Sequence, residues 1–368
     1  MSEHTVAIVG TGPDPSNPTV KGFAMGYRHA EAYTNHDDCR LVGCADIVPE
    51  NAVAFADAFD IPDDGIFESY EKMLDALEPD IVSVTVPPAI HADIVVGCAR
   101  RDVEAIHCEK PMATEWADAR RMVQECHRRD VQLTFNRQRR FGRPFTEAKR
   151  LLDAGEIGEL RRVEIGWGDF YDTGAHTVDL AGMFNDDRPA EWVIAGLDYR
   201  DEDVRFGVHQ ENQMWAQWRY TNGVYGMAST EPEAEFVGAA LLLRGTEGII
   251  RIDATDGPML ELERGGTKTE IDVGGETMHH TGAEEGRYGS EFHDRAVAEI
   301  VDSLETGAES TISGRIGLNT TEILFAGYES VRRRGRVDLP LDIDDNPLTS
   351  MVDSGAIVPE PAPEEAEQ

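Results

Sequence analysis

The feature that most constrains the fold is an apolar run over residues 5–9 that ends directly at Gly10-Thr11-Gly12. Its β-branched residues predict a buried strand, and the glycines predict a tight turn whose backbone can approach a phosphate group. The third glycine of this fingerprint does not follow two residues later. Residues 13–23 are rich in Pro, Asp, Ser and Asn, so they predict a loop inserted into the turn, with Gly26 as the glycine that packs a helix on the strand.

A second expected strand, residues 41–45, ends at Asp46. An acid at this place binds the ribose of an adenosine and repels a 2′-phosphate. The sequence therefore favours NAD as cofactor, while NADP stays open because the long loop contributes Lys21. The alternative is a plain strand, turn and helix without a nucleotide, since short glycine fingerprints also match by chance.

Strand and helix patterns alternate up to about residue 135, with further strands at residues 81–86 and 103–108. This alternation predicts an α/β fold whose N-terminal domain, residues 1–140, is a Rossmann doubly wound parallel sheet. Such sheets bind their ligands beyond the carboxyl ends of the strands. Asp46, Pro87 and Lys110 all follow strand ends, so we expect them at one crevice.

Residues 141–343 predict a second α/β domain with a large, open, mostly antiparallel sheet. One face of this sheet would take helices and the other would stay open unless a partner covers it, which predicts a homodimer or homotetramer. The acidic, proline-rich residues 344–368 predict a disordered tail. The expected strands cover residues 161–167, 192–197, 213–220, 224–229, 240–243, 249–252, 260–263 and 269–273.

Asp172 and His176 are four residues apart, which places them on one face of a helix. Imidazole is the side chain best suited to move a proton near neutral pH, and Lys110 adds a positive hydrogen-bond donor. These three groups together suit the reversible oxidation of an alcohol. Each has a structural alternative: a surface turn for Lys110, a satisfied core histidine for His176 and a helix cap for Asp172.

The chain of 368 residues carries 70 acidic and 34 basic residues, a formal net charge of −36. Acid spread over the whole chain predicts a host with a salty cytoplasm, because at about 1 M salt the screening length shrinks to roughly 3 Å. The same charge argues against nucleic acid and against anionic membranes as partners. The expected partner is a small molecule, a sugar or polyol.

The five cysteines are odd in number and form no Cys-x-x-Cys motif. They predict reduced thiols in a cytoplasmic protein rather than a disulfide framework. No apolar run is long enough to span a bilayer, and no segment has the pattern of a signal peptide. The adjacent His279 and His280 lack neighbouring carboxylate or cysteine ligands, so no metal site is expected.

These motifs, in this order and spacing, resemble the Gfo/Idh/MocA oxidoreductases over about residues 5–340. The matching positions are Gly10, Gly12, residues 26–32, Asp46, residues 86–91, 109–111, 135–137, 140–141, 155–158 and 172–179.

The resemblance implies a Rossmann domain followed by an α/β domain, and hydride transfer between NAD(P) and a hydroxyl of a sugar, sugar acid or cyclitol. It implies that Lys110 contacts the substrate hydroxyl near the nicotinamide, that His176 is the acid/base and that Asp172 modulates it. Asp179 resembles a substrate-contacting or structural position. Cofactor contacts are implied for Gly10, Gly12, Asp46, Pro87, Glu109 and Lys110, and substrate contacts for Lys110, Arg140, Asp172, His176 and Asp179.

The chain departs from the family pattern at two places. The phosphate loop is longer, and the stretch between Trp167 and Asp172 is shorter than in many relatives, so no single relative's substrate is carried over. Two other functions stay open on this fold. One is a glycosidase that uses tightly held NAD without net redox change, and the other is a non-catalytic sugar sensor, against which the retained Lys110, Asp172 and His176 argue.

The charge generates a first prediction. We expect the melting temperature to rise strongly between dilute buffer and multimolar KCl, because salt screens the repulsion among the 70 acidic residues. Thermal scans over a KCl series measure this, with sucrose as an uncharged stabilising control. A melting temperature that is the same in both buffers would contradict the salt-adapted interpretation.

Overall fold

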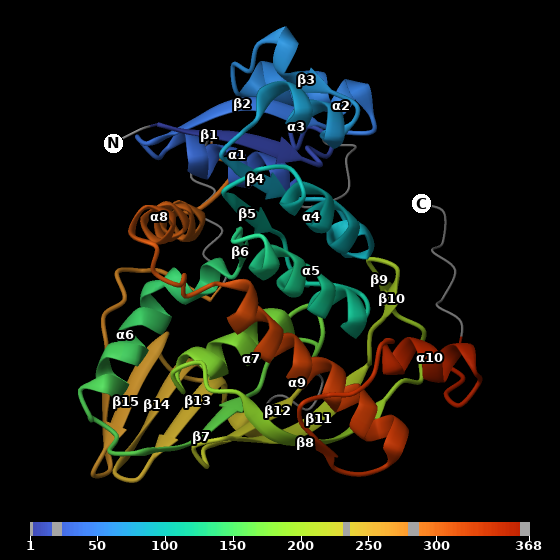
Figure 1. Cartoon of the computed structure of the whole chain (residues 1–368). Helices are drawn as coiled ribbons and strands as arrows, with labels where there is room; N and C mark the ends of the chain where they lie inside the picture. Colours follow the sequence, from blue (N-terminus) through green and yellow to red (C-terminus); the bar gives the residue numbers. More distant parts are fainter. Residues whose placement is uncertain (1–2, 17–23, 231–235, 279–286, 361–368) are drawn as a thin grey trace, which may run out of the picture. The chain divides into compact units, whose positions relative to one another are not determined.

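The computed structural model describes residues 3–16, 24–230, 236–278 and 287–360 (Figure 1). The chain divides into two compact units, each described by itself below. The first comprises Met1–Ala113, Asp118–Phe141 and His279–Leu318, and the second comprises Thr114–Ala117, Gly142–Met278 and Asn319–Gln368. The expected boundary after residue 140 thus lies beside the observed one, but the first unit also takes a segment from much later in the chain.

The first unit is built on a six-stranded parallel sheet with the strand order β3-β2-β1-β4-β5-β6. This is the order of doubly wound dinucleotide-binding sheets, so the predicted fold class of this part is confirmed. The strands are β1 (His4–Val9), β2 (Cys39–Ala45), β3 (Ile66–Phe67), β4 (Ile81–Val84), β5 (Ala105–Cys108) and β6 (Gln132–Phe135).

Helices connect these strands, as the alternating pattern predicted. They are α1 (Met25–Thr34), α2 (Pro49–Ala58), α3 (Tyr70–Leu77), α4 (His91–Ala99) and α5 (Trp116–Arg128), with 3-10 turns η1 (Asp63–Gly65), η2 (Pro88–Ile90) and η3 (Gln138–Phe141). Gly26 of α1 packs on the first turn, since a Cβ there would lie 2.8 Å from the carbonyl oxygen of Thr11. The expectation that Gly26 is the packing glycine is therefore confirmed.

The later segment of the first unit contains α8 (Glu291–Thr306), which the sequence had placed in the second domain. Val297 and Val301 of α8 join the core that contains Tyr27 and Ala30 of α1. Beyond α8, the backbone N–H of Phe135 donates to the carbonyl oxygen of Ile312 at 3.0 Å, which covers the edge strand β6. The apolar face of α8 is complementary to α1, and periodicity alone does not reveal which core a helix joins.

The second unit contains a nine-stranded sheet with the order β16-β15-β14-β13-β7-β12-β11-β8-β17. Every neighbouring pair is antiparallel except β7 and β12, so the predicted mostly antiparallel sheet is confirmed. The strands are β7 (Leu160–Ile165), β8 (Ala190–Asp198), β11 (Gln213–Tyr220), β12 (Tyr225–Ser229), β13 (Ala239–Gly245), β14 (Gly248–Ala254), β15 (Leu260–Arg264), β16 (Thr267–Glu270) and β17 (Val337–Asp338). A separate hairpin pairs β9 (Val204–Arg205) with β10 (Val208–His209).

The two faces of this sheet differ because side chains alternate along each strand. One face is fully buried and lies under α6 (Arg143–Asp153), α7 (Gly174–Met183) and α9 (Gly314–Arg333), as Figure 1 shows. The opposite face remains open among the described residues, and Trp215 on it is 38 % exposed. The buried face presents Val163, Ile165, Ala216, Trp218, Leu241, Leu243, Ile250 and Ile252.

The structure corrects the expectation of a disordered tail from residue 344. Residues 347–353 form α10 (Pro347–Asp353), whose first backbone N–H groups donate to the side chain of Asn346. Leu348 is fully buried, and Arg332 of α9 pairs with Asp345 at 2.5 Å. The acidic composition of this segment did not reveal the buried Leu348 or the ion pair of Asp345, because an acidic residue that has an arginine partner is ordered as readily as any other. The expectation for residues 361–368 lies outside the described residues.

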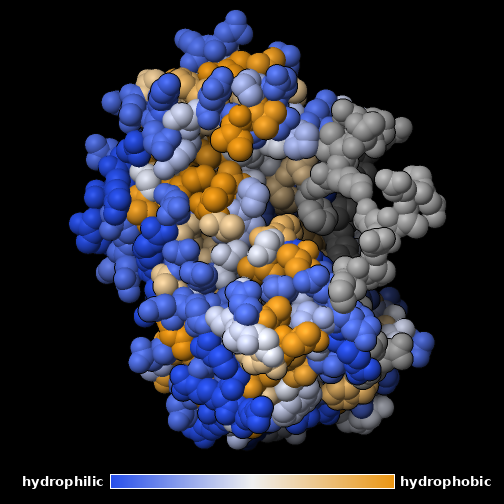
Figure 2. All heavy atoms as spheres, turned by 90° about the vertical axis from the view of Figure 1, so that its right-hand side faces the viewer, coloured by the Kyte–Doolittle hydropathy of each residue, from blue (hydrophilic) through white to orange (hydrophobic). Residues whose placement is uncertain are grey.

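All five cysteines are buried and free. Burial raises the pKa of Cys39 and Cys44 to about 12, so their thiols stay protonated near neutral pH. No helix in the described ranges is long and apolar enough to cross a membrane. Figure 2 shows a surface on which hydrophilic residues predominate, as the composition requires.

Candidate active site

The glycine-rich turn after β1 has the backbone geometry that its sequence predicts. Gly10 and Gly12 adopt positive φ angles of 87° and 66°, which favour glycine. A Cβ at Gly10 would lie 2.5 Å from Val86, whereas a Cβ at Gly12 would meet nothing within 4 Å. Gly10 therefore closes the turn against β4, and Gly12 leaves space beside its backbone. Residues 17–23, including Lys21, lie outside the described part of the loop.

Asp46, at the end of β2, is held against this turn. Its Oδ2 accepts hydrogen bonds from the backbone N–H of Gly12 at 3.0 Å and from the hydroxyl of Thr11 at 3.1 Å. Its Oδ1 accepts one from the N–H of Val48 at 2.9 Å. The structure thus brings together the two features that suggested a dinucleotide, the open glycine and the acid, and these residues fit NAD.

Pro87 follows β4 and begins the turn into α4. Nearby, His91 is fully buried, and its Nε2 lies 2.8 Å from the carbonyl oxygen of Val86. Its Nδ1 lies 3.1 Å from the carbonyl oxygen of Pro111. Burial lowers the pKa of His91, although these carbonyl groups oppose the shift. This histidine therefore fixes the segment after β4 to the segment after Lys110.

Glu109 at the end of β5 is buried, with 5 % of its surface exposed. Its Oε1 lies 2.8 Å from Nε2 of His29 and accepts a hydrogen bond from the Asn136 amide at 2.6 Å. Its Oε2 accepts one from the backbone N–H of Lys110 at 3.0 Å. Both oxygens are thus engaged by the protein, and a cofactor contact of Glu109 stays a prediction.

The charge on Glu109 is stabilised by its neighbours. Burial by itself would raise the pKa of Glu109, but the hydrogen bonds from His29 and Asn136 and the nearby Lys110 overcome this and lower the pKa to about 2. The carboxylate is therefore ionised at neutral pH and accepts hydrogen bonds only, which places a proton on Nε2 of His29. Nδ1 of His29 lies 2.7 Å from the hydroxyl of Ser83.

The sequence analysis assigned no role to this cluster of buried histidines. The ring of His29 stacks on that of His107 with centroids 4.9 Å apart, and Nδ1 of His107 lies 3.0 Å from the hydroxyl of Thr134. Burial lowers the pKa of His107 well below its usual range and that of His293 to about 3. In the sequence, the one sign of this cluster is the presence of polar residues inside apolar strands, such as His107 in β5.

In the second unit, α7 begins at Gly174, and Thr173 occupies its N-cap position without a side-chain cap. Asp169 orders the turn that leads into this helix, because its Oδ1 accepts hydrogen bonds from the backbone N–H groups of Asp172 at 2.6 Å and Thr173 at 3.0 Å. Its Oδ2 accepts one from the hydroxyl of Thr173 at 2.9 Å. Asp172 is therefore not the capping residue, and it stands one turn before His176, which is 3 % exposed.

Asp179 and Arg140 occupy more interior positions. Asp179 is 1 % exposed and accepts a hydrogen bond from the hydroxyl of Thr320 at 3.3 Å, an environment that favours the structural alternative. Arg140, in η3 of the first unit, is 4 % exposed and donates through Nη1 to the carbonyl oxygen of Thr311 at 2.9 Å. Substrate contacts of both residues stay predictions.

The expected site residues are thus divided between the units. Gly12 and Asp46 are in direct contact, Glu109 bonds to the backbone of Lys110, and Asp172 lies just before α7 while His176 lies in the first turn of that helix. The first unit holds Gly10, Gly12, Asp46, Pro87, Glu109, Lys110 and Arg140, and the second holds Asp172, His176 and Asp179.

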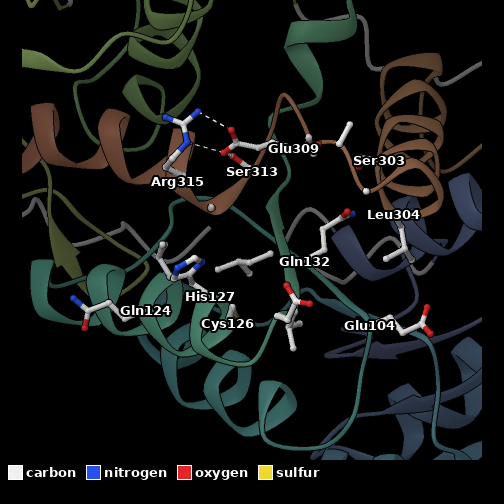
Figure 3. Close-up of a pocket in the computed structure, with 18 residues that line it drawn as sticks. Glu104, Gln124, Cys126, His127, Gln132, Ser303, Leu304, Glu309, Ser313 and Arg315 are labelled. Carbon is white, nitrogen blue, oxygen red and sulfur yellow. Dashed lines mark hydrogen bonds and ion pairs between the residues drawn. The ribbon is translucent and has the colours of Figure 1, made fainter.

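Figure 3 shows a pocket of about 780 Å³ in the first unit. It is lined by Glu104, which precedes β5, by Gln132, the first residue of β6, and by Leu304 near the end of α8. Glu309 and Arg315, drawn with their ion pair, close one side. The pocket lies at the amino ends of the strands, whereas ligands of doubly wound sheets bind at the carboxyl ends. It is therefore not the expected cofactor site.

Comparison with known proteins agrees with this geometry. Residues 5–137 match the model of the Gfo/Idh/MocA oxidoreductases, described as an oxidoreductase family with an NAD-binding Rossmann fold. This match covers 133 of the 368 residues, all of them in the N-terminal part of the chain.

Its relatives are distant in sequence but similar over most of their length. The chain is 23 % identical to the inositol 2-dehydrogenase of Rhizobium meliloti, covering 86 % of this chain and 96 % of that protein. It is 25 % identical to the D-apiose dehydrogenase of Rhizobium rhizogenes, covering 71 % and 79 %. The crystal structure of an oxidoreductase from Agrobacterium radiobacter with NAD+, L-tartaric acid and magnesium superposes with a TM-score of 0.73 at 21 % identity, covering 92 % and 98 %.

The buried Glu109 generates a stability prediction. We expect Glu109→Gln to lower the free energy of unfolding by about 3–5 kcal/mol, because it leaves buried donors without their charged acceptor. The pKa of Glu109 is lowered from 4.5 to about 2, so this stabilisation is present above about pH 4.5 and is lost as the pH falls towards 2. Urea unfolding at pH 7 and at lower pH measures both effects.

The matched control is Glu3→Gln. Glu3 pairs with Arg40, and both side chains are about half exposed, at 52 % and 55 %. An exposed pair of this kind contributes about 0–1 kcal/mol. Equal, small effects of both substitutions at pH 7 would contradict the stabilising role of the Glu109 cluster.

Proposed function

We propose that the protein is an NAD-dependent oxidoreductase that acts on a hydroxyl group of a sugar, sugar acid or cyclitol. The observation that carries this proposal is the contact of Asp46 with Gly12 at 3.0 Å, at the carboxyl edge of a parallel Rossmann sheet. Open backbone beside Gly12 accommodates a pyrophosphate, and the carboxylate accepts hydrogen bonds from ribose hydroxyls. The names of the relatives, dehydrogenases of inositol and apiose, support the substrate class.

NAD is preferred over NADP in this proposal for an electrostatic reason. A carboxylate at Asp46 repels the 2′-phosphate that distinguishes NADP. The next two residues, Ile47 and Val48, are exposed and apolar and provide no positive charge to compensate it. When bound, NAD supplies the nicotinamide carbon that accepts the hydride.

The chain's own residues would handle the proton and the oxygen. In the forward direction, the His176 imidazole takes the hydroxyl proton, and the Asp172 carboxylate stabilises the imidazolium that forms. The Lys110 ammonium donates a hydrogen bond to the alcohol oxygen and stabilises its developing negative charge. These roles rest on the family resemblance.

Absorbance of the reduced nicotinamide tests the proposal directly. Purified protein in multimolar KCl is offered NAD or NADP with aldoses, uronates, deoxy sugars and inositols in turn. Reduction of NAD with one substrate class supports the proposal. Binding of NAD without any turnover would move the assignment to a sugar sensor or to a glycosidase that regenerates its NAD.

We expect Lys110→Met and His176→Ala each to lower kcat by about a hundredfold or more, the usual effect of losing a general acid–base or charge-stabilising group. NAD should still bind to both variants in titrations, because neither substitution touches the glycine-rich turn. Lys268→Met is the control for Lys110, since Lys268 lies on β16 and pairs with Glu261 at 3.1 Å. Near-normal turnover of either variant would remove that residue from the mechanism.

We further propose that the open face of the nine-stranded sheet binds a second copy of this chain. Over β8, β11 and β12 the face carries the apolar side chains of Trp192, Ile194, Trp215 and Met227, with Gln217 and Arg219 of β11 between them. On the neighbouring strands of the sheet, acidic and basic side chains pair with one another, as Glu164 of β7 does with Arg244 of β13 at 2.9 Å. A charge-balanced, partly apolar face on a chain of net charge −36 is the surface where two copies repel each other least.

Light scattering in multimolar KCl tests this association. We expect a dimer or tetramer for the wild type, and a smaller species for Trp215→Glu, because a carboxylate there would be buried at the interface. Val53→Glu is the control, since Val53 is similarly exposed, at 47 % against 38 % for Trp215, but lies on α2 of the first unit. A wild-type monomer at micromolar concentration would contradict the proposal.

A further inference from the structure

A buried carboxyl group in the second unit lies behind the start of α7. Glu211, two residues before the start of β11, is 4 % exposed. It was not among the residues that the sequence singled out, and the proposed mechanism does not use it. Burying a carboxyl group costs free energy unless hydrogen-bond partners surround it.

Both oxygens of Glu211 accept hydrogen bonds from fixed donors. Oε1 accepts from the backbone N–H of Phe170 at 2.5 Å, and Oε2 accepts from the hydroxyl of Tyr328 at 2.5 Å. Tyr328 lies in α9 and is fully buried. Glu211 thus connects the segment before α7 to α9 through one side chain.

The segment that Glu211 holds is the turn that leads into α7. Phe170 follows Asp169, whose carboxylate accepts hydrogen bonds from the N–H groups of Asp172 and Thr173. The Phe170 ring packs edge-on against Tyr328 with centroids 6.2 Å apart. A Cβ at Gly327 would lie 2.7 Å from Phe170, so α9 approaches this ring as closely as a glycine allows. A shift of Phe170 would therefore move the turn that Asp169 orders and with it the start of the helix.

We propose that Glu211 is a positioning residue, whose carboxyl group fixes Phe170 and the adjacent turn that Asp169 orders, and thereby sets the place of Asp172 and His176. The catalytic part of this inference rests on the proposed function. The structural part, the anchoring of the first turn of α7, stands on the contacts of Glu211 alone. Misplacing a catalytic group by about 1 Å can cost a hundredfold in rate, so an anchor of this kind affects turnover without touching the substrate.

The charges around Glu211 make its role depend on pH. Burial raises the pKa of Glu211 to about 7, and the nearby Asp169 adds to the shift, while the Tyr328 hydroxyl and the Phe170 N–H oppose it. Tyr171, on the same segment as Asp169, is buried, and Arg205 of β9 neutralises Asp169 in part from 3.3 Å. Ionisation of Glu211 places a second negative charge beside Asp169.

The sign of the pH effect on stability follows from this shift. In the unfolded chain the group ionises near pH 4.5, and in the folded protein near pH 7. Its contribution to stability is therefore complete below about pH 4.5 and is lost as the pH rises through 7. Glu211→Gln keeps an acceptor oxygen but does not ionise, so the melting temperature of the wild type relative to this variant should fall between pH 5 and pH 8.

Hydrogen exchange tests the anchor without any substrate. In Glu211→Ala, the amides of residues 170–176 should exchange at least tenfold faster than in the wild type, whereas those of β13 and β14 should not change. Glu261→Gln is the control, because Glu261 is also buried, at 7 %, but bonds to Arg251 on the sheet. Unchanged exchange of residues 170–176 in folded Glu211→Ala would overturn the proposal.

Kinetics then separate positioning from a mere loss of folded enzyme. We expect Glu211→Ala to lower kcat at least tenfold with unchanged NAD affinity, and to raise the isotope effect on kcat for a substrate deuterated at the reacting carbon. A loss of folded enzyme alone would lower kcat without changing the isotope effect, and that result would contradict the catalytic part. An inactive wild type would refute the proposed function, while faster exchange in Glu211→Ala would still support the anchor.

Discussion

The first unit depends on one buried negative charge. The carboxylate of Glu109 lies at the end of β5, and its donors come from α1, from the backbone of Lys110 and from Asn136 just after β6. His29, the donor from α1, is in turn bonded to Ser83 of β4. A buried charge is tolerated only where such donors surround it, so the four segments must meet in this register. The same arrangement fixes the backbone of the lysine to which we assign the substrate oxygen.

In the second unit, carboxyl groups also accept hydrogen bonds from the backbone near the start of α7. Asp169 orders the turn before the helix, and Glu211 holds the neighbouring Phe170 from the side of α9. In both units a buried carboxyl group orders the backbone next to a proposed catalytic residue. The difference is electrostatic. Glu109 has donors enough to stay ionised, whereas Glu211 lies beside another acid and holds its proton up to about pH 7.

Local sequence patterns predicted most helices and strands, but they predicted less well which of these pack together in one unit. The strand before Gly10, the position of Asp46 and the meander of the second sheet all follow from periodicity and turn residues, and the structure has them in place. The return of α8 to the first unit and the ordered α10 were missed. Both depend on contacts between separate segments, namely Val297 with Tyr27 and Asp345 with Arg332. Local sequence patterns do not show which other segment a helix will contact.

The sequence by itself determined the class of fold, the glycine-rich turn with its acid and the pair Asp172 and His176, because each depends on residues close together in the chain or on a simple repeat. Only the tertiary structure decided that Glu109 bonds to His29, that Asp169 orders the turn before α7, and that Glu211 lies buried against Phe170 of this turn. The contacts of Glu109 and Glu211 join residues far apart in the chain. Their energies depend on burial, which exists only once the chain has folded.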